Sequence, residues 1–569
     1  MNIRIVLLLV YTGGSYVALS SVYADDALST NEATTSTWQQ GNASAPVPVL
    51  VQQVDGTTKL EWHGGATVNY YNNSVETAAG QFGTPLNNGS FYNLQGQSDL
   101  RSIADNGNVD YFQIGVTRSN DPAVLSLYHQ QINNVQVGRS GPGYLLAAGD
   151  VAPNFSSLSS ALGLRGLIAQ KQLDQTSVTG YAGVVVPSWE YLGRQVPRYQ
   201  LIRDVRGVKV EHAFSPTFKL YGTGQYGAER EGTADIPGLM PTIVRSGSVG
   251  FQYNAATYQV TGETAVSHFE QQLFGLQEAD KRVGLASIID GSWRGQSLSL
   301  RAGYHDLGPG YVSLSQMASP GIREVYTGAD WVAAPWISVG ADLRNSKNIS
   351  LATLFSPSQL TDTNSANVRA NINFGSAYPG WALSVQQNIS LSRNPVDQLA
   401  RNQQTSLGLN YANQNWAASL SFGLGIMRNE AATVYDSDTS TWQGSISRNF
   451  NNMTDLLPAS WTVSANLSAS LQSQDLLVGD TAKAYNATLG LSGQRTGWGV
   501  FNVSLGNGYN TRPNGLSTLW MTFLQADFSR PLTEKVSAKI YLRNTRRNIA
   551  DPTLAAEEQN IGMQLGYNF

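Results

Sequence analysis

The sequence predicts an all-β protein, a transmembrane antiparallel up-and-down β-barrel of about 24–26 strands. Three observations lead to this fold class. Charged residues make up only 13% of the chain, against about 25% in globular domains. Stretches of about ten residues alternate apolar and polar side chains along most of the chain. No apolar stretch reaches the roughly 20 residues that a membrane helix needs.

The alternation of side chains is clearest in the second half of the chain. At 461–472 and 416–426, apolar residues alternate with Ser, Thr, Asn, Gln, Gly or Ala, which puts the apolar set on one face of a strand. A soluble β-sandwich also alternates, but its outer face needs more charge than these stretches carry. Aromatic residues begin several of the expected strands, as in a girdle at a membrane interface. They are Trp381, Trp416, Trp461 and Trp498.

Short and long connections alternate along the chain, which gives the topology. The expected tight turns are 105–108, 215–216, 334–335, 413–415, 495–497 and 530–533. The expected long loops include 72–90, 230–240, 307–322 and 346–363. In barrels of this kind the short turns lie in the periplasm and the long loops outside the cell. The region from Val135 to Leu173 is the hardest to divide into strands.

The N-terminal residues predict a cleaved signal peptide at 1–24. Arg4 supplies a positive charge, Ile5–Tyr11 is apolar, and small residues precede Asp25. Residues 25–56 are rich in Ser, Thr, Ala, Pro and Gln and are expected to form a flexible periplasmic lead. The barrel is then expected at 57–569. A lead of about thirty residues is too short for a folded plug domain.

Composition excludes several classes of function. The chain has no cysteine, which removes disulfides, thiol nucleophiles and Cys-ligated metals. Its net charge is −4 and no basic tract is longer than the Arg546-Arg547 pair, so we expect no nucleic-acid partner. The five histidines are scattered, and no metal, phosphate-loop or nucleophile-elbow motif occurs. We therefore expect no cofactor, no metal and no enzyme, although a catalytic site assembled across the barrel stays an alternative.

The last nine residues carry an assembly signal. Ile561, Met563, Leu565, Tyr567 and Phe569 alternate with Gly, Gln and Asn up to a terminal aromatic. This resembles the terminal strand by which the barrel assembly machinery recognises outer-membrane proteins of Gram-negative bacteria. The resemblance covers the last strand and implies an integral outer-membrane protein whose partners are that machinery and the lipid. The apolar members of the strand are expected to face lipid.

One segment departs from the strand pattern. Gly149-Asp150 and Asn154 are followed by Leu164-Arg165-Gly166, which resembles the Gly-Asp and Arg-Gly elements in the barrel of fimbrial ushers. The match covers fewer than twenty residues, and no usher plug or flanking domain accompanies it. Pro153 should stop strand pairing, so the residues after it form a loop. That loop is either a plain connection or a constriction of the pore to which Asp150, Asn154 and Arg165 contribute.

The strand before the last carries a row of cations. Lys535, Lys539, Arg543 and Arg547 lie on the face opposite Val536 and its apolar neighbours. If the apolar face meets lipid, these cations line the lumen, where they could favour anionic solutes. Alternatively they pair with acidic residues of neighbouring strands such as Asp527 and stiffen the wall.

The expected function is that of an outer-membrane channel. A barrel of this size suits the translocation or export of a large polar cargo, a polysaccharide or an unfolded polypeptide, because porins commonly use about 16–18 strands. We expect inward loops or a partner protein, such as a periplasmic export partner, to obstruct so wide a pore. The alternatives are a general diffusion porin and, from other classes, a surface enzyme or a structural receptor. A count of 16 or 18 strands would favour the porin.

Overall fold

The computed structural model describes residues 59–77, 86–125, 129–153, 155–159, 163–193, 198, 200–236, 238–272, 279–314, 321–350, 359–396, 398–430, 436–451, 461–476, 481–511, 519–549 and 555–569. The contacts divide the chain into Met1–Val49 and Leu50–Phe569, and all described residues belong to the second unit. The expected signal peptide (1–24) and lead (25–56), as well as Asn154, lie outside the described residues.

The described residues form 26 strands and one short helix. The first half of the barrel comprises β1 (Lys59–Thr77), β2 (Gly89–Ile103), β3 (Val109–Ser119), β4 (Gln130–Gly141), β5 (Tyr144–Val151), β6 (Leu164–Leu173), β7 (Thr176–Val185), the helix α3 (Glu190–Gly193), β8 (Arg203–Ser215), β9 (Phe218–Glu229), β10 (Thr242–Asn254), β11 (Tyr258–Gln272), β12 (Ala279–Arg294) and β13 (Leu298–Leu307). The second half comprises β14 (Gly321–Ala334), β15 (Ile337–Ser350), β16 (Gln359–Asn373), β17 (Trp381–Arg393), β18 (Leu399–Ala412), β19 (Trp416–Asn429), β20 (Ser437–Asn451), β21 (Trp461–Leu476), β22 (Thr481–Arg495), β23 (Gly499–Thr511), β24 (Leu519–Pro531), β25 (Val536–Ile549) and β26 (Ala556–Asn568).

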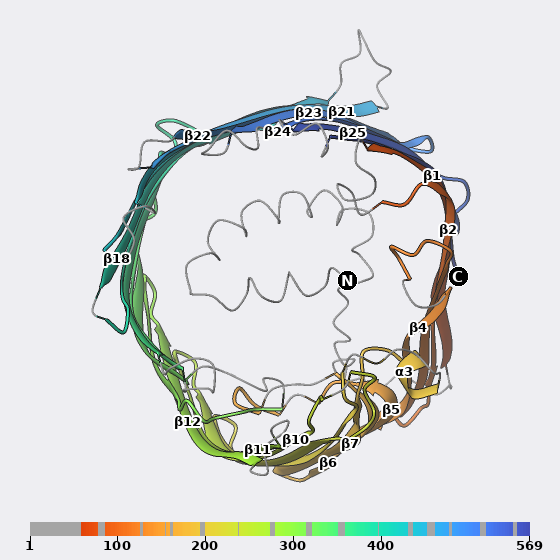
Figure 1. The fold of residues 1–569 in the computed structure, drawn as a ribbon, viewed down its shortest axis with the longest axis vertical. Coiled ribbons are helices and arrows are strands. Elements are labelled where there is room, and N and C mark those ends of the chain that lie inside the picture. Colours follow the sequence, from red (N-terminus) through yellow and green to blue (C-terminus); the bar gives the residue numbers. More distant parts are fainter. Residues whose placement is uncertain are drawn as a thin grey trace. The chain divides into compact units, whose positions relative to one another are not determined.

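The strands close into one antiparallel barrel (Figure 1). Each strand pairs with its neighbours in the chain, and β1 pairs with β26 from Gly65↔Asn568 to Thr77↔Ala556. Closure removes both sheet edges, whose unpaired amides and carbonyls could not be tolerated in lipid. The predicted fold class and strand number are therefore confirmed.

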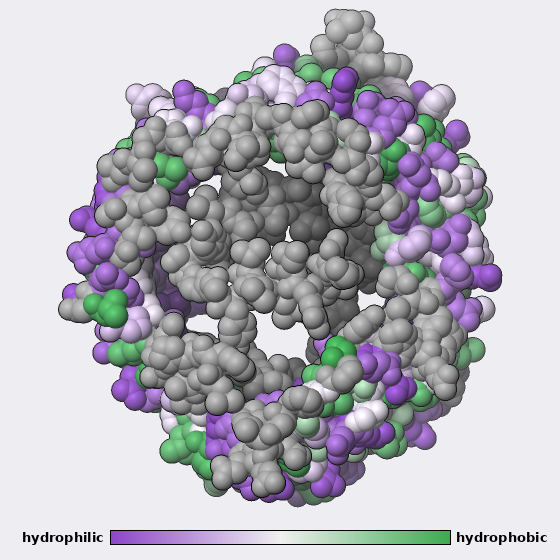
Figure 2. All heavy atoms as spheres, in the orientation of Figure 1, coloured by the Kyte–Doolittle hydropathy of each residue, from purple (hydrophilic) through white to green (hydrophobic). Residues whose placement is uncertain are grey.

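The wall encloses a wide lumen. Strands about 4.8 Å apart and tilted about 40° give 26 strands a backbone radius of roughly 26 Å. Figure 2 looks down on one rim, where hydrophilic side chains predominate and hydrophobic ones are scattered. Among the described residues, no helix is long and apolar enough to cross a membrane.

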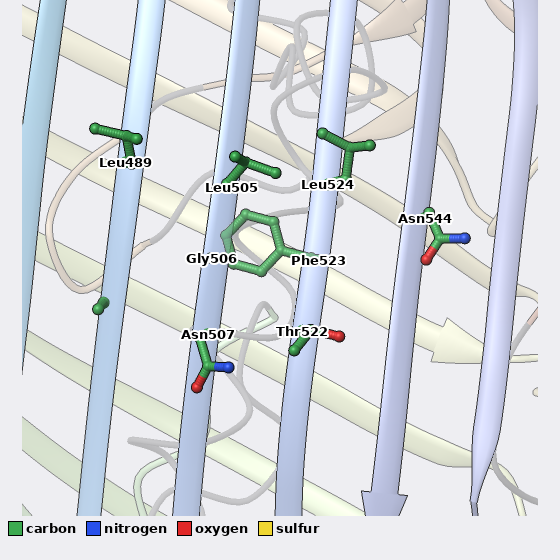
Figure 3. A pocket seen from close by; sticks show the side chains of 9 residues that line it. Leu489, Leu505, Gly506, Asn507, Thr522, Phe523, Leu524 and Asn544 are labelled. Carbon is green, nitrogen blue, oxygen red and sulfur yellow. The ribbon is translucent and has the colours of Figure 1, made fainter.

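The outer face of the wall carries the apolar side chains, as the alternation predicts. Val249, Val283 and Leu285 are each more than 60% exposed. Figure 3 shows Leu489, Leu505 and Leu524 in one row across β22, β23 and β24. In lipid, large exposed apolar side chains of this kind cost nothing, whereas in water they would form an aggregating patch.

An aromatic girdle lies at the short-turn end of the wall. Trp381, Trp416 and Trp461 are the first residues of β17, β19 and β21. The guanidinium of Arg448 lies 4.9 Å from the ring centre of Trp416, and that of Arg495 lies 5.8 Å from that of Trp461. Tryptophan with a stacked arginine suits an interface that is apolar on one side and wet on the other.

Candidate functional site: an obstructed polar lumen

Two connections fold back onto the inner face of the wall between β6 and β13, on the lower side of Figure 1. We call residues 155–159, between β5 and β6, the first inner loop. Residues 308–314, after β13, are the second inner loop. Both contact the face of the sheet opposite the exposed apolar side chains, so they lie inside the barrel.

The first inner loop is held by the carboxylate of Glu263 on β11. The Ser156 hydroxyl donates to Glu263 Oε1 at 2.5 Å, and the Leu158 amide donates to Oε2 at 3.2 Å. The Tyr221 hydroxyl of β9 also donates to Oε2, at 3.2 Å. Glu263 is only 4% exposed, so these three donors compensate a carboxylate that would otherwise be costly to bury.

The second inner loop is held by polar groups of the wall and by the first loop. The Val312 amide donates to Ser267 Oγ at 2.9 Å, and Arg203 donates to the Leu314 carbonyl at 3.0 Å. The Tyr311 hydroxyl donates to the Leu158 carbonyl at 2.9 Å. Burial, reinforced by the nearby Glu263 charge, raises the pKa of Tyr311, so its hydroxyl remains a donor at physiological pH. Each loop therefore stabilises the other.

Apolar packing completes the attachment of both inner loops. Phe155 and Leu314 are 2% and 1% exposed and lie in one cluster of buried wall residues, and Leu158 and Tyr311 lie in a second. Burying each such side chain is worth about 1.5–3 kcal/mol. A polar pocket of about 300 Å³ remains between the first loop and the wall, lined in part by Lys209, Tyr221 and Glu263.

Much of the opposite inner wall is neutral. On β17–β23, the positions that alternate with the outward apolar residues are almost all Ser, Thr, Asn, Gln, Gly or Ala. None that the structure describes is charged or aromatic, and Met427, Leu476 and Val500 are the apolar exceptions. Such a wall offers exchanging hydrogen bonds but no fixed charge to a passing solute.

The rest of the lumen is charged, and its charges are largely paired. Arg301 and Arg369 each bind both Asp330 and Asp342, a four-residue cluster on β13–β16. Further pairs on the inner face are Arg101–Asp99, Arg203–Glu229, Lys209–Glu211 and His305–Asp290. Pairing reduces the net field that a solute would meet.

The cation row on β25 belongs to this paired sector. Lys539 lies 3.7 Å from Asp527, and Arg547 lies 3.7 Å from Glu558. Arg543 lies over the Tyr541 ring, and Lys535 is exposed in the turn before β25. This arrangement favours the interpretation that the cations pair with carboxylates and stiffen the wall, rather than forming a ring of free cations. An effect of the row on ion selectivity stays a prediction.

The structure brings Asp150 and Arg165 together where β5 ends. They occupy opposed positions on β5 and β6, with Arg165 Nε 3.4 Å from Asp150 Oδ1. Their side chains are 16% and 10% exposed. Their chain neighbours Val151 and Leu164 belong to the inner apolar cluster, so by alternation the ion pair points away from that cluster. A gating role for this pair remains a hypothesis.

The Asp150 carboxylate also replaces strand pairing. β5 stops pairing with β4 at Gln136↔Gly149, which leaves the earlier β4 amides that point toward β5 without a strand partner, while the other edge of β4 stays paired with β3. Asp150 Oδ2 accepts from the Val135 amide at 2.7 Å, and Trp189 donates to it at 2.7 Å. Glu190, at the start of α3, accepts from the Ile132 amide at 2.9 Å. Neither Trp189 nor Glu190 is among the residues that the sequence predicts for this site.

Gly149 orients the Asp150 carboxylate toward the β4 amides that β5 does not pair. We therefore expect Gly149→Ala to lower the stability of the folded barrel. Its φ is +109°, and an added Cβ would lie 2.1 Å from the Val135 carbonyl oxygen. The strained backbone alone costs about 1–3 kcal/mol. The temperature at which the folded, fast-migrating form is lost on gels should fall. Gly163→Ala is the matched control, because nothing lies within 4 Å of a Cβ there, and equal effects of the two changes would contradict the account.

The terminal strand lies on the seam of the barrel. Ile561, Met563, Leu565 and Tyr567 are exposed on the outer face. Phe569 exchanges two backbone hydrogen bonds of 3.1 Å with Gly64, and its ring centre lies 4.7 Å from that of Trp62. These positions match those expected of an assembly signal.

The histidines do not form a catalytic constellation among the described residues. His305 Nε2 lies 2.8 Å from Asp290, and its other ring nitrogen lies 3.9 Å from Glu324. His212 lies 2.8 Å from the Thr176 hydroxyl with no described carboxylate on the other side of its ring. No described histidine thus links a hydroxyl to a carboxylate, and no group of three metal-ligating side chains occurs within the described ranges.

Comparison with solved structures finds large barrels. The chain is similar to the ferric enterobactin receptor PfeA of Pseudomonas aeruginosa (TM-score 0.42, 10% identity, 90% of this chain and 81% of that one). It is also similar to a chain of the E. coli P pilus tip assembly intermediate PapC-PapD-PapK-PapG (0.45, 11%, 82% and 63%) and to Pseudomonas aeruginosa OccK11 (0.27, 9%, 92% and 100%). These values reflect barrel architecture and nothing more specific. No protein-family model and no curated protein sequence matches the chain.

A closed wall with apolar side chains outside and polar ones inside belongs in a bilayer. The chain is a transmembrane β-barrel, of the kind that the sequence predicts for the outer membrane of Gram-negative bacteria. The lumen of this barrel is polar and is narrowed on one side by the two inner loops.

Proposed function

We propose that the barrel is a translocation channel for a large polar cargo, either a polysaccharide or an unfolded polypeptide. The observation that carries the proposal is the combination of a 26-stranded wall with an uncharged inner face across β17–β23. A cargo that slides past Ser, Asn, Gln and Thr exchanges weak hydrogen bonds and meets no charge that would trap it.

The inner loops supply the obstruction that so wide a pore requires. They occupy the wall opposite the neutral face and are held by apolar packing and by hydrogen bonds to wall residues such as Glu263, Ser267 and Arg203. Cargo or a periplasmic partner could displace them without disturbing strand pairing. In this proposal the inner loops form the gate, and the Asp150–Arg165 pair anchors the neighbouring end of β5.

A general diffusion porin is the alternative. Such porins commonly have about 16–18 strands, so 26 strands weigh against it. The cation row on β25 would favour anionic solutes if it were unpaired, but Lys539 and Arg547 lie near carboxylates.

Polymer exclusion distinguishes the two functions. Uncharged dextrans of increasing size should enter the reconstituted channel, and transiently reduce its ion current, well beyond the size limit of a 16-stranded porin measured in the same bilayer. Glu263→Ala, which loosens the first inner loop, should raise the limit further. A size limit equal to that of the porin for both forms would instead support diffusion of small nutrients.

A further inference from the structure

A row of cationic and aromatic side chains crosses four adjacent strands at the long-loop end of the wall. Arg206 of β8 pairs in register with Tyr226 of β9. Tyr226 pairs with Arg245 of β10, and Arg245 pairs with His268 of β11. Neighbouring strands are about 4.8 Å apart, so the two arginines are close enough for their guanidinium groups to converge over the tyrosine ring.

This row points outward, toward lipid. Val208, Val249 and Val266 have the same strand parity as the row, lie nearer the middle of the wall and are 47%, 68% and 46% exposed. The row therefore lies directly beyond the apolar band. An arginine at that height costs only about 0–1 kcal/mol, compared with about 2–4 kcal/mol at the membrane midplane.

Several other outward cations at this end of the barrel form ion pairs, namely Lys281–Glu270, Arg323–Asp306, Lys347–Asp362 and Arg428–Asp438. Arg206 instead stacks over Tyr226 at 4.7 Å, and within the described ranges neither Arg206 nor Arg245 has a carboxylate within ion-pair distance. Nδ1 of His268 is buried with no hydrogen-bond partner in the structure.

Between this row and the middle of the wall, three outward positions on β9 and β10 are glycines, which we call the glycine strip. Gly222 and Gly224 on β9 and Gly247 on β10 occupy its outward positions. A Cβ added to any of them would meet no atom closer than 3.5 Å, so packing does not demand glycine there. The missing side chains leave a shallow groove between Val208 and Val266, with the cations at its outer end.

We propose that this row binds the phosphate of an outer-leaflet lipid, with one acyl chain lying along the glycine strip. Guanidinium groups form charge-assisted, bidentate hydrogen bonds with phosphate, and the lipid places its phosphate at the height of the row and its chains below it. The site is independent of the cargo of the channel. Free phosphate would have the same headgroup chemistry but would gain nothing from the groove.

Binding to the purified full chain in detergent micelles tests the proposal, with lipid A, enzymatically dephosphorylated lipid A and inorganic phosphate as probes. The wild-type chain should retain lipid A in native mass spectra, and the other two probes should bind far more weakly. Arg206→Gln combined with Arg245→Gln should weaken lipid A binding about 30-fold, since each cation contributes about 1 kcal/mol. The double lysine variant should keep part of the affinity.

Arg428→Gln is the matched control, because Arg428 lies on the same outer belt but is paired with Asp438. It should bind lipid A as the wild type does. If the wild-type chain bound dephosphorylated lipid A as tightly as lipid A, the proposal would be overturned. This comparison uses no variant, so a folding defect cannot affect it. Comparable binding of inorganic phosphate, or unchanged binding by the double glutamine variant, would overturn it as well.

Discussion

Deletion of Phe569, or Phe569→Asp, should prevent assembly of the barrel while export across the inner membrane continues. Phe569 supplies two backbone hydrogen bonds to Gly64 and packs against Trp62, at the point where β26 closes onto β1. A carboxylate there would face lipid, and an open seam would leave amides and carbonyls unpaired at several kcal/mol each. The variant should accumulate in the periplasm and be degraded.

The measurement is outer-membrane fractionation with heat-modifiable migration on gels. Tyr378→Asp is the control, because Tyr378 is a 64% exposed aromatic residue in the connection between β16 and β17, far from the seam. It should assemble normally. Normal assembly of the Phe569 deletion would show that the terminal strand is not the recognition signal.

Glu263→Ala should release the first inner loop and increase the single-channel conductance. The change leaves the Ser156 hydroxyl, the Leu158 amide and the Tyr221 hydroxyl without their acceptor. Each buried donor that loses its partner costs about 1–3 kcal/mol, which is comparable to the apolar packing that holds this loop. The second inner loop should loosen too, because the Tyr311 hydroxyl is bound to the Leu158 carbonyl.

Conductance in planar bilayers and limited proteolysis at 155–159 together check this prediction. Asp527→Asn is the matched control, since Asp527 is a lumen carboxylate that contacts Lys539 and Asn502 and neither inner loop. It should leave both measurements unchanged. Faster proteolysis of Glu263→Ala without a larger conductance would show that the loop is mobile but does not limit the pore.

The barrel was predictable from the sequence because its physics is local. Side chains alternate along each strand because lipid contacts one face of the wall and water contacts the other. The sequence at 461–472 and 416–426 therefore predicts which side chains face lipid without any tertiary information. Loop lengths then ordered the strands, and the structure has 26, at the upper end of the expected number. The ambiguous region from Val135 to Leu173 resolves into β4, β5 and β6, because Pro153 ends one strand and a two-residue turn follows β6.

The inner loops were less predictable, because their contacts are distant in the chain. Ser156 meets Glu263 across 107 positions and Tyr311 meets Leu158 across 153, and no local pattern encodes such pairs. A signal was nevertheless present: Phe155 and the apolar run Tyr311-Val312 stand out in otherwise polar loops. The same reasoning explains why Trp189 and Glu190 were missed. Glu190 accepts from the Ile132 amide of β4 across 58 positions and Trp189 donates to Asp150 of β5 across 39, through tertiary contacts alone.

Single-channel conductance of the purified full chain tests the central claim most directly. Inserted in a planar bilayer, the barrel should open in discrete steps with weak ion selectivity, because the described lumen charges are largely paired and the wall across β17–β23 is neutral. Its open steps should exceed those of a 16-stranded porin in the same salt. Folded insertions that conduct at no voltage, in wild type and in Glu263→Ala alike, would contradict a channel function.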